Sequence, residues 1–344
     1  METVLSDGRD IDTKIATLTG EASHQLTPAP HQPGVWETMP GAQRTDPTYY
    51  DRPMLKPSVW KPYIPAYYFV GGAAGASLAL GAAAQLDGSH ELDDLIQRCH
   101  WTGIIGSSIA AVLLISDLGR PSRFLFMLRV FRPTSPMNMG AWILAVAPSA
   151  AVTAGLFARR TNGILQRLGE VAGYTSGIFG LALATYTGVL VANTAVPIWQ
   201  ECRRVLPILF GASAVASAGS IFDLLVEGSR TQRITYSFGL AGRVAELTAG
   251  LAMERVASRV PSVGRPLKRG FSGFLWRAAT ILTAGSIVAM LWPGQKRRTR
   301  EIAGILGLGG SLLMRFAVDE AGKASALDPR ASFHQQRSDL SNLD

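Results

Sequence analysis

Long runs without a charged residue dominate the pattern of hydrophobic and polar positions along the chain. The first lies between Lys61 and Asp87, where 25 consecutive residues carry no charge. About 20 apolar residues in a helix are enough to cross the hydrocarbon core of a bilayer. Comparable runs lie between Arg98 and Asp117, Arg132 and Arg159, Glu170 and Glu201, Arg204 and Asp223, and Arg277 and Lys296. The pattern therefore predicts a polytopic membrane protein.

Helix stop signals and window lengths divide these runs into eight predicted spans. Gly119 and Pro121 end the second span. The sixth span carries Arg243 and Glu246, and the eighth must extend across Arg315, whose long stem is expected to snorkel to the membrane surface. The predicted spans are 63–86, 99–116, 137–158, 168–192, 205–226, 233–256, 271–292 and 301–318.

These spans predict an all-α integral membrane protein with eight transmembrane helices in two packed four-helix bundles. The first bundle covers residues 61–200 and the second covers 201–320. Residues 1–60 are rich in Pro, Thr, Asp and Gln and read as an extended arm, and 321–344 form a polar C-terminal tail. Eight crossings place both termini on one side of the membrane, here called the terminal side. The loops predicted on that side carry more Arg and Lys than the opposite loops, which favours cytoplasmic termini.

Composition narrows the chemistry that the chain can carry by itself. The net charge of +8 accompanies no RNA-binding motif, so nucleic acid is not an expected partner. Cys99 and Cys202 are the only cysteines, whereas an iron–sulfur cluster needs about four thiolates. Among the five histidines, only His100 is near a span, which excludes a haem held by two histidines and leaves no expected metal site.

Charged residues inside predicted spans mark a second candidate region. Arg243 and Glu246 are three residues apart and share a helix face, with Asp223 and Arg277 as candidate partners on neighbouring spans. Ionisable groups within a membrane are costly and face a partner or water. Two interpretations remain open: a proton path through the second bundle, or a buried ion cluster that fixes helix register.

The segment 117–142 is unusually rich in Arg and Phe for a loop between two helices. Its arginines are Arg120, Arg123, Arg129 and Arg132. This composition suits a protein interface, although a positive-inside loop or a contact with lipid headgroups has the same composition. Asp117 begins the segment at the membrane edge, where its carboxylate can accept a proton from a quinol hydroxyl, cap the loop, or pair with an arginine.

Tyrosines at the same membrane level suggest what Asp117 would face. Tyr67 lies near the start of the first span and Tyr186 near the end of the fourth. Tyrosine hydroxyls can hydrogen-bond the oxygens of a quinone, although tyrosine also anchors helices at membrane interfaces. Gly71 and Gly72, on the first span, would leave room for a ring. Together these residues predict a quinone site at the terminal-side end of the first bundle.

Four segments resemble the NrfD/PsrC family of membrane anchor subunits of respiratory molybdopterin oxidoreductases. They read DRPMLKP, YYFVGGAAGAS, DLGRPSRFLFMLRVFRPTSPMNMGAW and YTGVLVANTAVPIW, and the resemblance covers about residues 49–320. It implies eight helices in two bundles, no haem, and a quinone site in the first bundle. Tyr186 matches the family's quinone-contacting tyrosine and Asp117 an aspartate implicated in some members. Tyr67 stands where several members use a histidine.

The resemblance also implies partners. A ferredoxin-like iron–sulfur subunit and a molybdenum or tungsten catalytic subunit would bind the anchor, and the exchangeable cofactor would be menaquinone or ubiquinone. The sequence therefore favours a quinone-reactive anchor in the inner, cytoplasmic membrane, one that does not by itself act on a soluble substrate. The alternatives are a secondary transporter or ion channel, with Asp223, Arg243 and Glu246 along its pathway, and a scaffold without redox chemistry.

Overall fold

The computed structural model describes residues 11–12, 17–18, 53, 55–118, 120–157, 163–225, 229–292 and 297–332. The chain divides into two units, Met1–Arg52 and Pro53–Asp344. In the first unit, β1 (Ile11–Asp12) pairs antiparallel with β2 (Thr17–Leu18), with Ile11 opposite Leu18. Most of the predicted N-terminal arm and the end of the predicted C-terminal tail lie outside the described residues.

The described part of the second unit is helical. Its short elements are η4 (His90–Leu92), η5 (Pro121–Leu128), α5 (Pro197–Glu201) and α8 (Pro261–Lys268). Its long helices are α1 (Tyr63–Asp87), α2 (Asp93–Asp117), α3 (Pro136–Phe157), α4 (Gly163–Ala192), α6 (Leu206–Leu225), α7 (Ser229–Ala257), α9 (Gly270–Leu291) and α10 (Arg297–Ala326). All-helical membrane architecture is therefore confirmed for this unit.

Seven of the long helices are long and apolar enough to cross a membrane, and α7 is the exception. Its 29 residues would extend about 44 Å at 1.5 Å per residue, so length is not what excludes it. Its sequence is too polar for a typical membrane-spanning helix, because it carries Arg230, Arg233, Arg243, Glu246 and Glu254. The sequence predicted a crossing here, and the structure shows a continuous helix over the whole predicted range.

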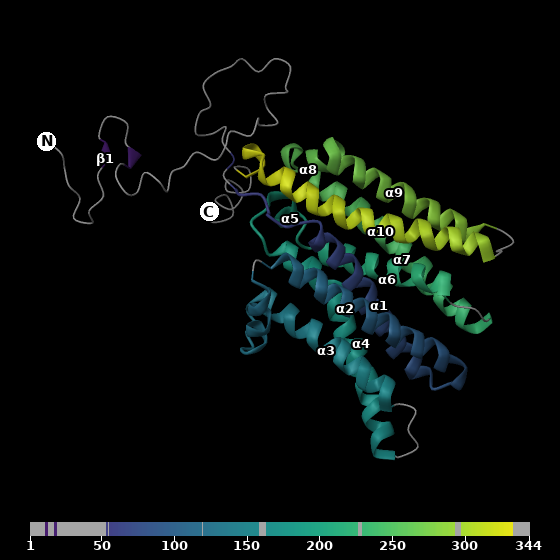
Figure 1. Ribbon diagram of the computed structural model, residues 1–344. Helices are drawn as coiled ribbons and strands as arrows, with labels where there is room; N and C mark the ends of the chain where they lie inside the picture. Colours follow the sequence, from purple (N-terminus) through teal and green to yellow (C-terminus); the bar gives the residue numbers. More distant parts are fainter. Residues whose placement is uncertain are drawn as a thin grey trace, which may run out of the picture. The chain divides into compact units, whose positions relative to one another are not determined.

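Helix contacts fall into two groups that meet along α1 and α6. One group comprises α1 to α4, and the other comprises α6, α7, α9 and α10. Figure 1 shows α3 with α4 on one flank of the helical array and α9 with α10 on the other. Helix α1 contacts members of both groups, namely α2, α4, α6 and α10. It is therefore the central helix of the array.

Small residues allow α1 to pack closely against α4. A Cβ added at Gly75 would collide with the Gly180 carbonyl oxygen and lie 2.8 Å from the backbone nitrogen of Ala184. Because lipid tails are as apolar as leucine, helices in membranes associate through close van der Waals contact, which small residues permit. The absence of a side chain at Gly75 therefore lets the backbones of α1 and α4 come into contact.

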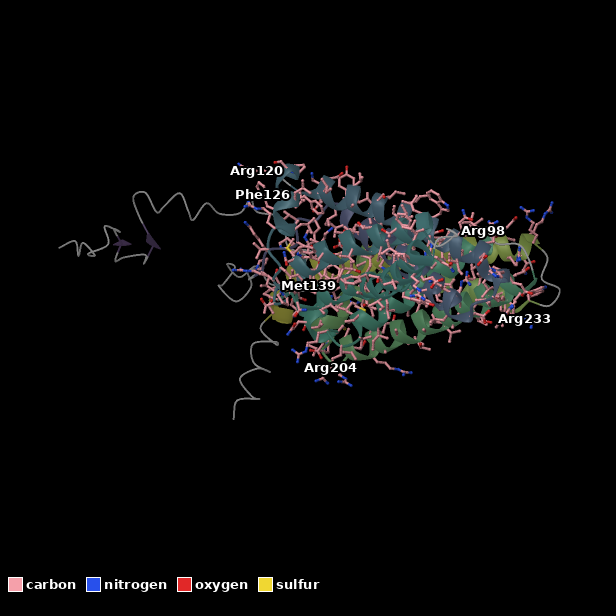
Figure 2. The ribbon with its side chains drawn as sticks, turned by 90° about the horizontal axis from the view of Figure 1, so that it is seen from below. Arg98, Arg120, Phe126, Met139, Arg204 and Arg233 are labelled. Carbon is pink, nitrogen blue, oxygen red and sulfur yellow. The ribbon has the colours of Figure 1, made fainter. Side chains whose placement is uncertain are left out.

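Aromatic contacts and hydrogen bonds join the start of α1 to the end of α10. The Trp60 ring stacks on Trp199 of α5 at 5.5 Å between centroids. Trp199 Nε1 donates to the Val318 carbonyl at 2.9 Å, and the backbone N–H of Ile198 donates to Ser325 Oγ at 3.4 Å. This end of the array corresponds to the terminal side. Figure 2 shows Arg120, Phe126, Met139 and Arg204 at one end and Arg98 and Arg233 at the other.

Arg315 does not snorkel, so that expectation is wrong. Its side chain is 1% exposed, and its guanidinium lies 3.9 Å from the centroid of the Phe210 ring. Its Nη2 also donates to the Phe210 carbonyl at 2.7 Å. The cation stays among the helices because the carbonyl and the aromatic ring of Phe210 on α6 stabilise it there.

The helix arrangement predicts that α7 crosses the membrane. Reporter fusions placed before residue 1 and after residue 344, which lie outside the described residues, should then report the same compartment. The physical reason is that α1 begins, and α10 ends, at one end of the array. Seven crossings, with α7 on the membrane surface, would instead place the two reporters in opposite compartments.

Candidate functional site

Three buried tyrosines gather where α1 meets α4. Tyr67 and Tyr68 are each 2% exposed and Tyr186 is 8% exposed. The rings of Tyr67 and Tyr68 are 5.6 Å apart between centroids, and both residues belong with Tyr186 to one buried cluster. The structure therefore brings together the two tyrosines that the sequence predicted for one site. Tyr68, the next residue on α1, is equally buried.

Glycines on neighbouring helices leave the space that these tyrosine side chains occupy. A Cβ on Gly140 of α3 would collide with the hydroxyl end of the Tyr186 ring, so glycine is required at that position. A Cβ on Gly71 would lie 3.7 Å from the Tyr67 ring, and one on Gly72 would lie 3.2 Å from Nη2 of Arg315. The two predicted glycines of α1 thus face different side chains. Gly71 faces the Tyr67 ring, and Gly72 faces the buried guanidinium of Arg315.

Asp117 lies at the terminal-side edge of the same group. It is the last residue of α2 and is half-buried. Its Oδ1 accepts a hydrogen bond from the backbone N–H of Lys61 at 3.2 Å, which ties the end of α2 to the chain entering α1. Asp117 therefore lies between solvent and the buried helices.

A row of charged residues on α10 was missed by the sequence analysis. Asp319 is 2% exposed, and its Oδ2 lies 2.8 Å from Nζ of Lys323. Arg315, Asp319 and Lys323 are spaced four residues apart, so they share one face of α10. The predicted span ended at residue 318, which placed Asp319 outside the membrane part of the helix. The spacing of the three charges was the signal that could have included it.

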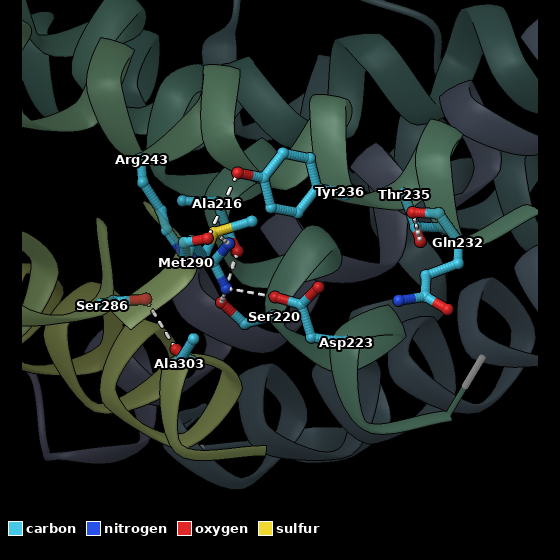
Figure 3. A network of polar contacts seen from close by, with 10 residues as sticks. All are labelled: Ala216, Ser220, Asp223, Gln232, Thr235, Tyr236, Arg243, Ser286, Met290 and Ala303. Atoms are coloured by element: carbon cyan, nitrogen blue, oxygen red, sulfur yellow. Dashed lines mark hydrogen bonds and ion pairs between the residues drawn. The ribbon is translucent and has the colours of Figure 1, made fainter. Parts of the chain in front are cut away.

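Arg243 forms the centre of a second buried network. It is 0% exposed, and its Nη2 donates to Asp223 Oδ2 at 2.6 Å and to Ser220 Oγ at 2.8 Å. Its Nη1 donates to the sulfur of Met290, whose carbonyl accepts a hydrogen bond from Tyr236 (Figure 3). The network joins α6, α7 and α9, so the pairing of Arg243 with Asp223 that the sequence proposed is present.

The other members of the predicted cluster lie apart from this pair. Glu246 is buried and its Oε2 accepts a hydrogen bond from Ser311 of α10 at 2.9 Å. Arg277 is exposed on α9, where its guanidinium donates to the carbonyls of Gly273 and Lys268. Arg277 therefore satisfies its charge near its own helix start and contacts neither Asp223 nor Glu246.

A groove lies between α7 and α9, with α10 behind it. Its lining residues include Glu246, Leu247, Gly250, Glu254, Trp276 and Thr280. Trp276 Nε1 donates to Glu254 Oε1 at 2.5 Å near the terminal side of the groove. None of Tyr67, Asp117 and Tyr186 lines it. The groove thus belongs to the second group of helices, at a place separate from the tyrosines.

The loop after α2 presents charged and apolar side chains together. Arg120, Arg129 and Arg132 are exposed, and Phe126 and Phe131 are 59% and 58% exposed. The side chain of Asn138 holds the loop by donating to the carbonyls of Met127 and Val130 and accepting from the backbone N–H of Arg132. The Arg123 side chain lies outside the described residues. Arg120, Arg129 and Arg132, which the sequence predicted for a protein interface, therefore lie on a loop that Asn138 holds in place by hydrogen bonds at the terminal side.

Histidine and cysteine side chains give no metal centre in the described ranges. No group of three or more His, Cys, Asp or Glu residues there could hold a metal ion. Cys99 and Cys202 are both buried and free, and His100 is 5% exposed among the helices.

The Asp223–Arg243 pair predicts a large loss of stability when one partner is removed. Asp223→Asn leaves a buried guanidinium without its counter-charge, and breaking such a pair typically costs about 3–5 kcal/mol. Asp94→Asn is the matched control because Asp94 pairs with Arg98 in an exposed position and should cost under about 1 kcal/mol. Thermal unfolding of the detergent-solubilised protein measures both. Equal effects of the two variants would contradict a stabilising role for the buried pair.

Comparison with known proteins assigns the chain to a family. No curated protein matches the chain significantly. The sequence profile of the family described as Polysulphide reductase, NrfD matches residues 52–324, which include α1 through nearly all of α10. Members of this family are membrane anchors of polysulfide reductase-type respiratory complexes, they typically bind quinone, and they partner iron–sulfur and catalytic subunits. The chain therefore belongs to the polysulphide reductase NrfD family of membrane subunits.

Proposed function

We propose that the protein is the quinone-reactive membrane anchor of a multi-subunit respiratory oxidoreductase, with a catalytic subunit of the molybdopterin type. The observation that carries this is the burial of Tyr67 and Tyr186 in one cluster of the helical array, with Asp117 at the edge of the array beside the chain that enters α1, in a chain of the NrfD family. The substrate within the membrane is menaquinone or ubiquinone. The electrons pass to or from an iron–sulfur subunit, because the two cysteines of this chain are too few for a cluster.

The proposed architecture is two four-helix bundles, one of α1 to α4 and one of α6, α7, α9 and α10. The contact pattern supports it, since each set packs mainly within itself and α1 and α4 pack on α6. In this arrangement α7 is the eighth crossing, and its charged residues are tolerated because Arg243 and Glu246 face protein. The arginine distribution supports cytoplasmic termini in the inner membrane.

The proposed site divides binding and proton exchange between its residues. The hydroxyls of Tyr67 and Tyr186 donate hydrogen bonds to the quinone oxygens, and Gly71 borders the ring beside Tyr67, whereas the space next to Gly72 is taken by Arg315 and Ala214. Asp117, at the half-exposed edge, exchanges with solvent the protons that accompany electrons. Tyrosine does not titrate near neutral pH as histidine does, so the carboxylate carries the proton exchange.

Two variants test this division in the assembled complex. Tyr186→Phe removes one hydroxyl and should weaken quinone binding by about 1 kcal/mol or more, which is a lost buried hydrogen bond. Asp117→Asn keeps the shape but removes the titrating group, so quinone turnover should fall by about 10²-fold. Quinone titration of the purified complex and steady-state turnover measure the two effects.

Tyr174→Phe is the control for the binding measurement, because Tyr174 is on the same helix, exposed and far from Tyr186 along it. Its affinity and turnover should match the unmodified complex. If Tyr186→Phe and Asp117→Asn both keep full quinone binding and reduction, the quinone binds elsewhere.

We further propose that the loop after α2 is the docking surface for a ferredoxin-like iron–sulfur subunit, which in turn carries the molybdenum or tungsten subunit. Arg120, Arg129 and Arg132 supply positive charge around the exposed rings of Phe126 and Phe131. Aromatic and arginine side chains are enriched in protein interfaces, and this surface lies next to Asp117 in the chain. An electron donor docked here would be close to the proposed quinone site.

Charge reversal of the docking loop should release the partner. The triple change Arg120→Glu, Arg129→Glu and Arg132→Glu replaces attraction by repulsion toward an acidic iron–sulfur protein. Co-purification with the tagged membrane subunit should then drop at least about tenfold. Arg167→Glu with Arg233→Glu is the control, because both are exposed and Arg233 lies at the opposite end of the array (Figure 2). Release by the control pair, or retention by the triple variant, would contradict this interface.

A second candidate function rests on Glu246. This buried carboxylate lines the groove between α7 and α9, where Ser311 donates to its Oε2. A proton- or ion-conducting role for the second bundle would use such a group. Isolation as a lone functional protein that moves ions without redox partners would favour this alternative over the quinone-reactive anchor.

A further inference from the structure

We propose that Asp319 of α10 relays protons between Tyr68 at the quinone site and Asp117 at the membrane edge. This inference rests on the proposed quinone function and adds to it a residue from the second group of helices. The substrate class is a quinone or quinol, and the task assigned to Asp319 is transfer of its protons across the buried layer that separates the tyrosines from solvent.

The position of Asp319 fits a group that acts within the protein. It is 2% exposed, and its Oδ1 accepts no hydrogen bond from any described residue. Oδ2 lies 2.8 Å from Nζ of Lys323, which also binds Glu320 at 2.9 Å. A buried carboxylate oxygen without a donor is costly, so such groups call for an explanation in terms of function, ion or water. Lys323 holds the carboxylate from one side and leaves the other oxygen available.

Packing contacts place Asp319 between the two ends of the route. The Tyr68 ring lies 5.8 Å from the Phe210 ring, and the guanidinium of Arg315, one turn before Asp319, lies over the same Phe210 ring. At the edge of the array, Asp117 binds the backbone of Lys61 next to Trp60, the Trp60 ring stacks on Trp199, and Trp199 donates to the carbonyl of Val318, the residue before Asp319. The Tyr68 hydroxyl is itself buried and has no hydrogen-bond partner among the described residues. Both groups therefore retain unused hydrogen-bonding capacity. They come from α1 and α10, which pack directly against each other.

Other charged and titratable groups surround this pair. Arg315 lies one turn before Asp319 on α10 and interacts with Tyr68, while Tyr67 and Tyr186 interact with Tyr68 from α1 and α4. Their hydroxyls are already assigned to the quinone oxygens. Asp117 lies at the edge of the array, where its Oδ1 accepts a hydrogen bond from the Lys61 backbone. Asp319 supplies the missing step between them.

The proton balance of the relay is simple. When a quinone is reduced, two electrons arrive from the iron–sulfur partner and each quinone oxygen gains one proton. One of these protons comes from solvent through Asp117. For the other, Asp319 first takes a proton from Asp117 through water, the Tyr68 O–H bond breaks as the new quinol O–H bond forms, and the protonated Asp319 returns a proton to Tyr68. Asp319 is then again the carboxylate that Lys323 binds, and Asp117 recovers its own proton from solvent. Tyr68 ends each cycle neutral, and quinol oxidation runs the same steps in reverse.

The experiment is Asp319→Asn in the assembled complex, compared with Glu320→Gln. Both variants remove one carboxylate that binds Lys323, but only Asp319 is buried. Asp319→Asn should lower quinone turnover by at least about tenfold, at the lower edge of losses typical when acid–base catalysis is removed, while quinone affinity stays within about twofold. Glu320→Gln should keep both. Tyr68→Phe should resemble Asp319→Asn, and the double variant should be no slower than either single variant, because the two act in series.

Two further measurements separate a relay from a structural role. The solvent deuterium isotope effect on turnover should increase in Asp319→Asn, and the carboxyl signal that accompanies quinone reduction in infrared difference spectra should be lost. If Asp319→Asn fails to assemble, the double variant Asp319→Asn with Lys323→Met removes both charges and gives the same readouts. Unchanged turnover, an unchanged isotope effect, or equal losses in Glu320→Gln would overturn the proposal.

Failure of the relay is distinguishable from failure of the quinone site. The relay is wrong if the variants of Asp319 turn over normally while Tyr186→Phe still weakens quinone binding. The quinone site itself is wrong if Tyr186→Phe leaves quinone affinity unchanged, whatever Asp319 does.

Discussion

The cost of burying charge inside a membrane governs this structure more than any other constraint. An unpaired charge in a low-dielectric interior is unfavourable by several kcal/mol or more, so each buried ion must have compensation. Arg243 finds it in Asp223, Arg315 in the Phe210 ring and carbonyl, and Asp319 in Lys323. The first two of these contacts join α6 to α7 and α6 to α10, and they fix which helix faces meet. The polar helix α7 is held among apolar neighbours by the same means.

Close helix packing then carries this arrangement to the candidate site. Helix α1 lies between the two groups, and Gly75 lets its backbone approach α4. That approach brings Tyr67 on α1 next to Tyr186 on α4, while Gly140 on α3 leaves space for the Tyr186 hydroxyl. The two hydroxyls proposed to bind a quinone thus come from separate helices. The distance between them depends on how closely these helices pack, which the glycines allow.

Much of this could be read from the sequence because hydrophobicity and membrane thickness are simple constraints. Charge-free runs located the helices, and the shared membrane level of Tyr67, Asp117 and Tyr186 proposed one site. Side-chain partners were harder to predict. Arg277 was a reasonable partner for Asp223 by depth, yet it bonds to carbonyls near the start of its own helix. Arg315 was expected at the surface, and Asp319 was left beyond the last span. Both errors arose because helix rotation and the true end of α10 decide burial, and neither follows from span length.

Mapping the quinone directly tests the central claim of this account. A photoreactive quinone analogue, activated in the assembled complex and followed by peptide mapping, would mark the helices that line its site. The account predicts labelling within 63–87 of α1 and 163–192 of α4, with competition by unmodified quinone. Labelling confined to the groove residues of α7 and α9, such as Leu247 and Thr280, would contradict it and move the quinone to the second group of helices.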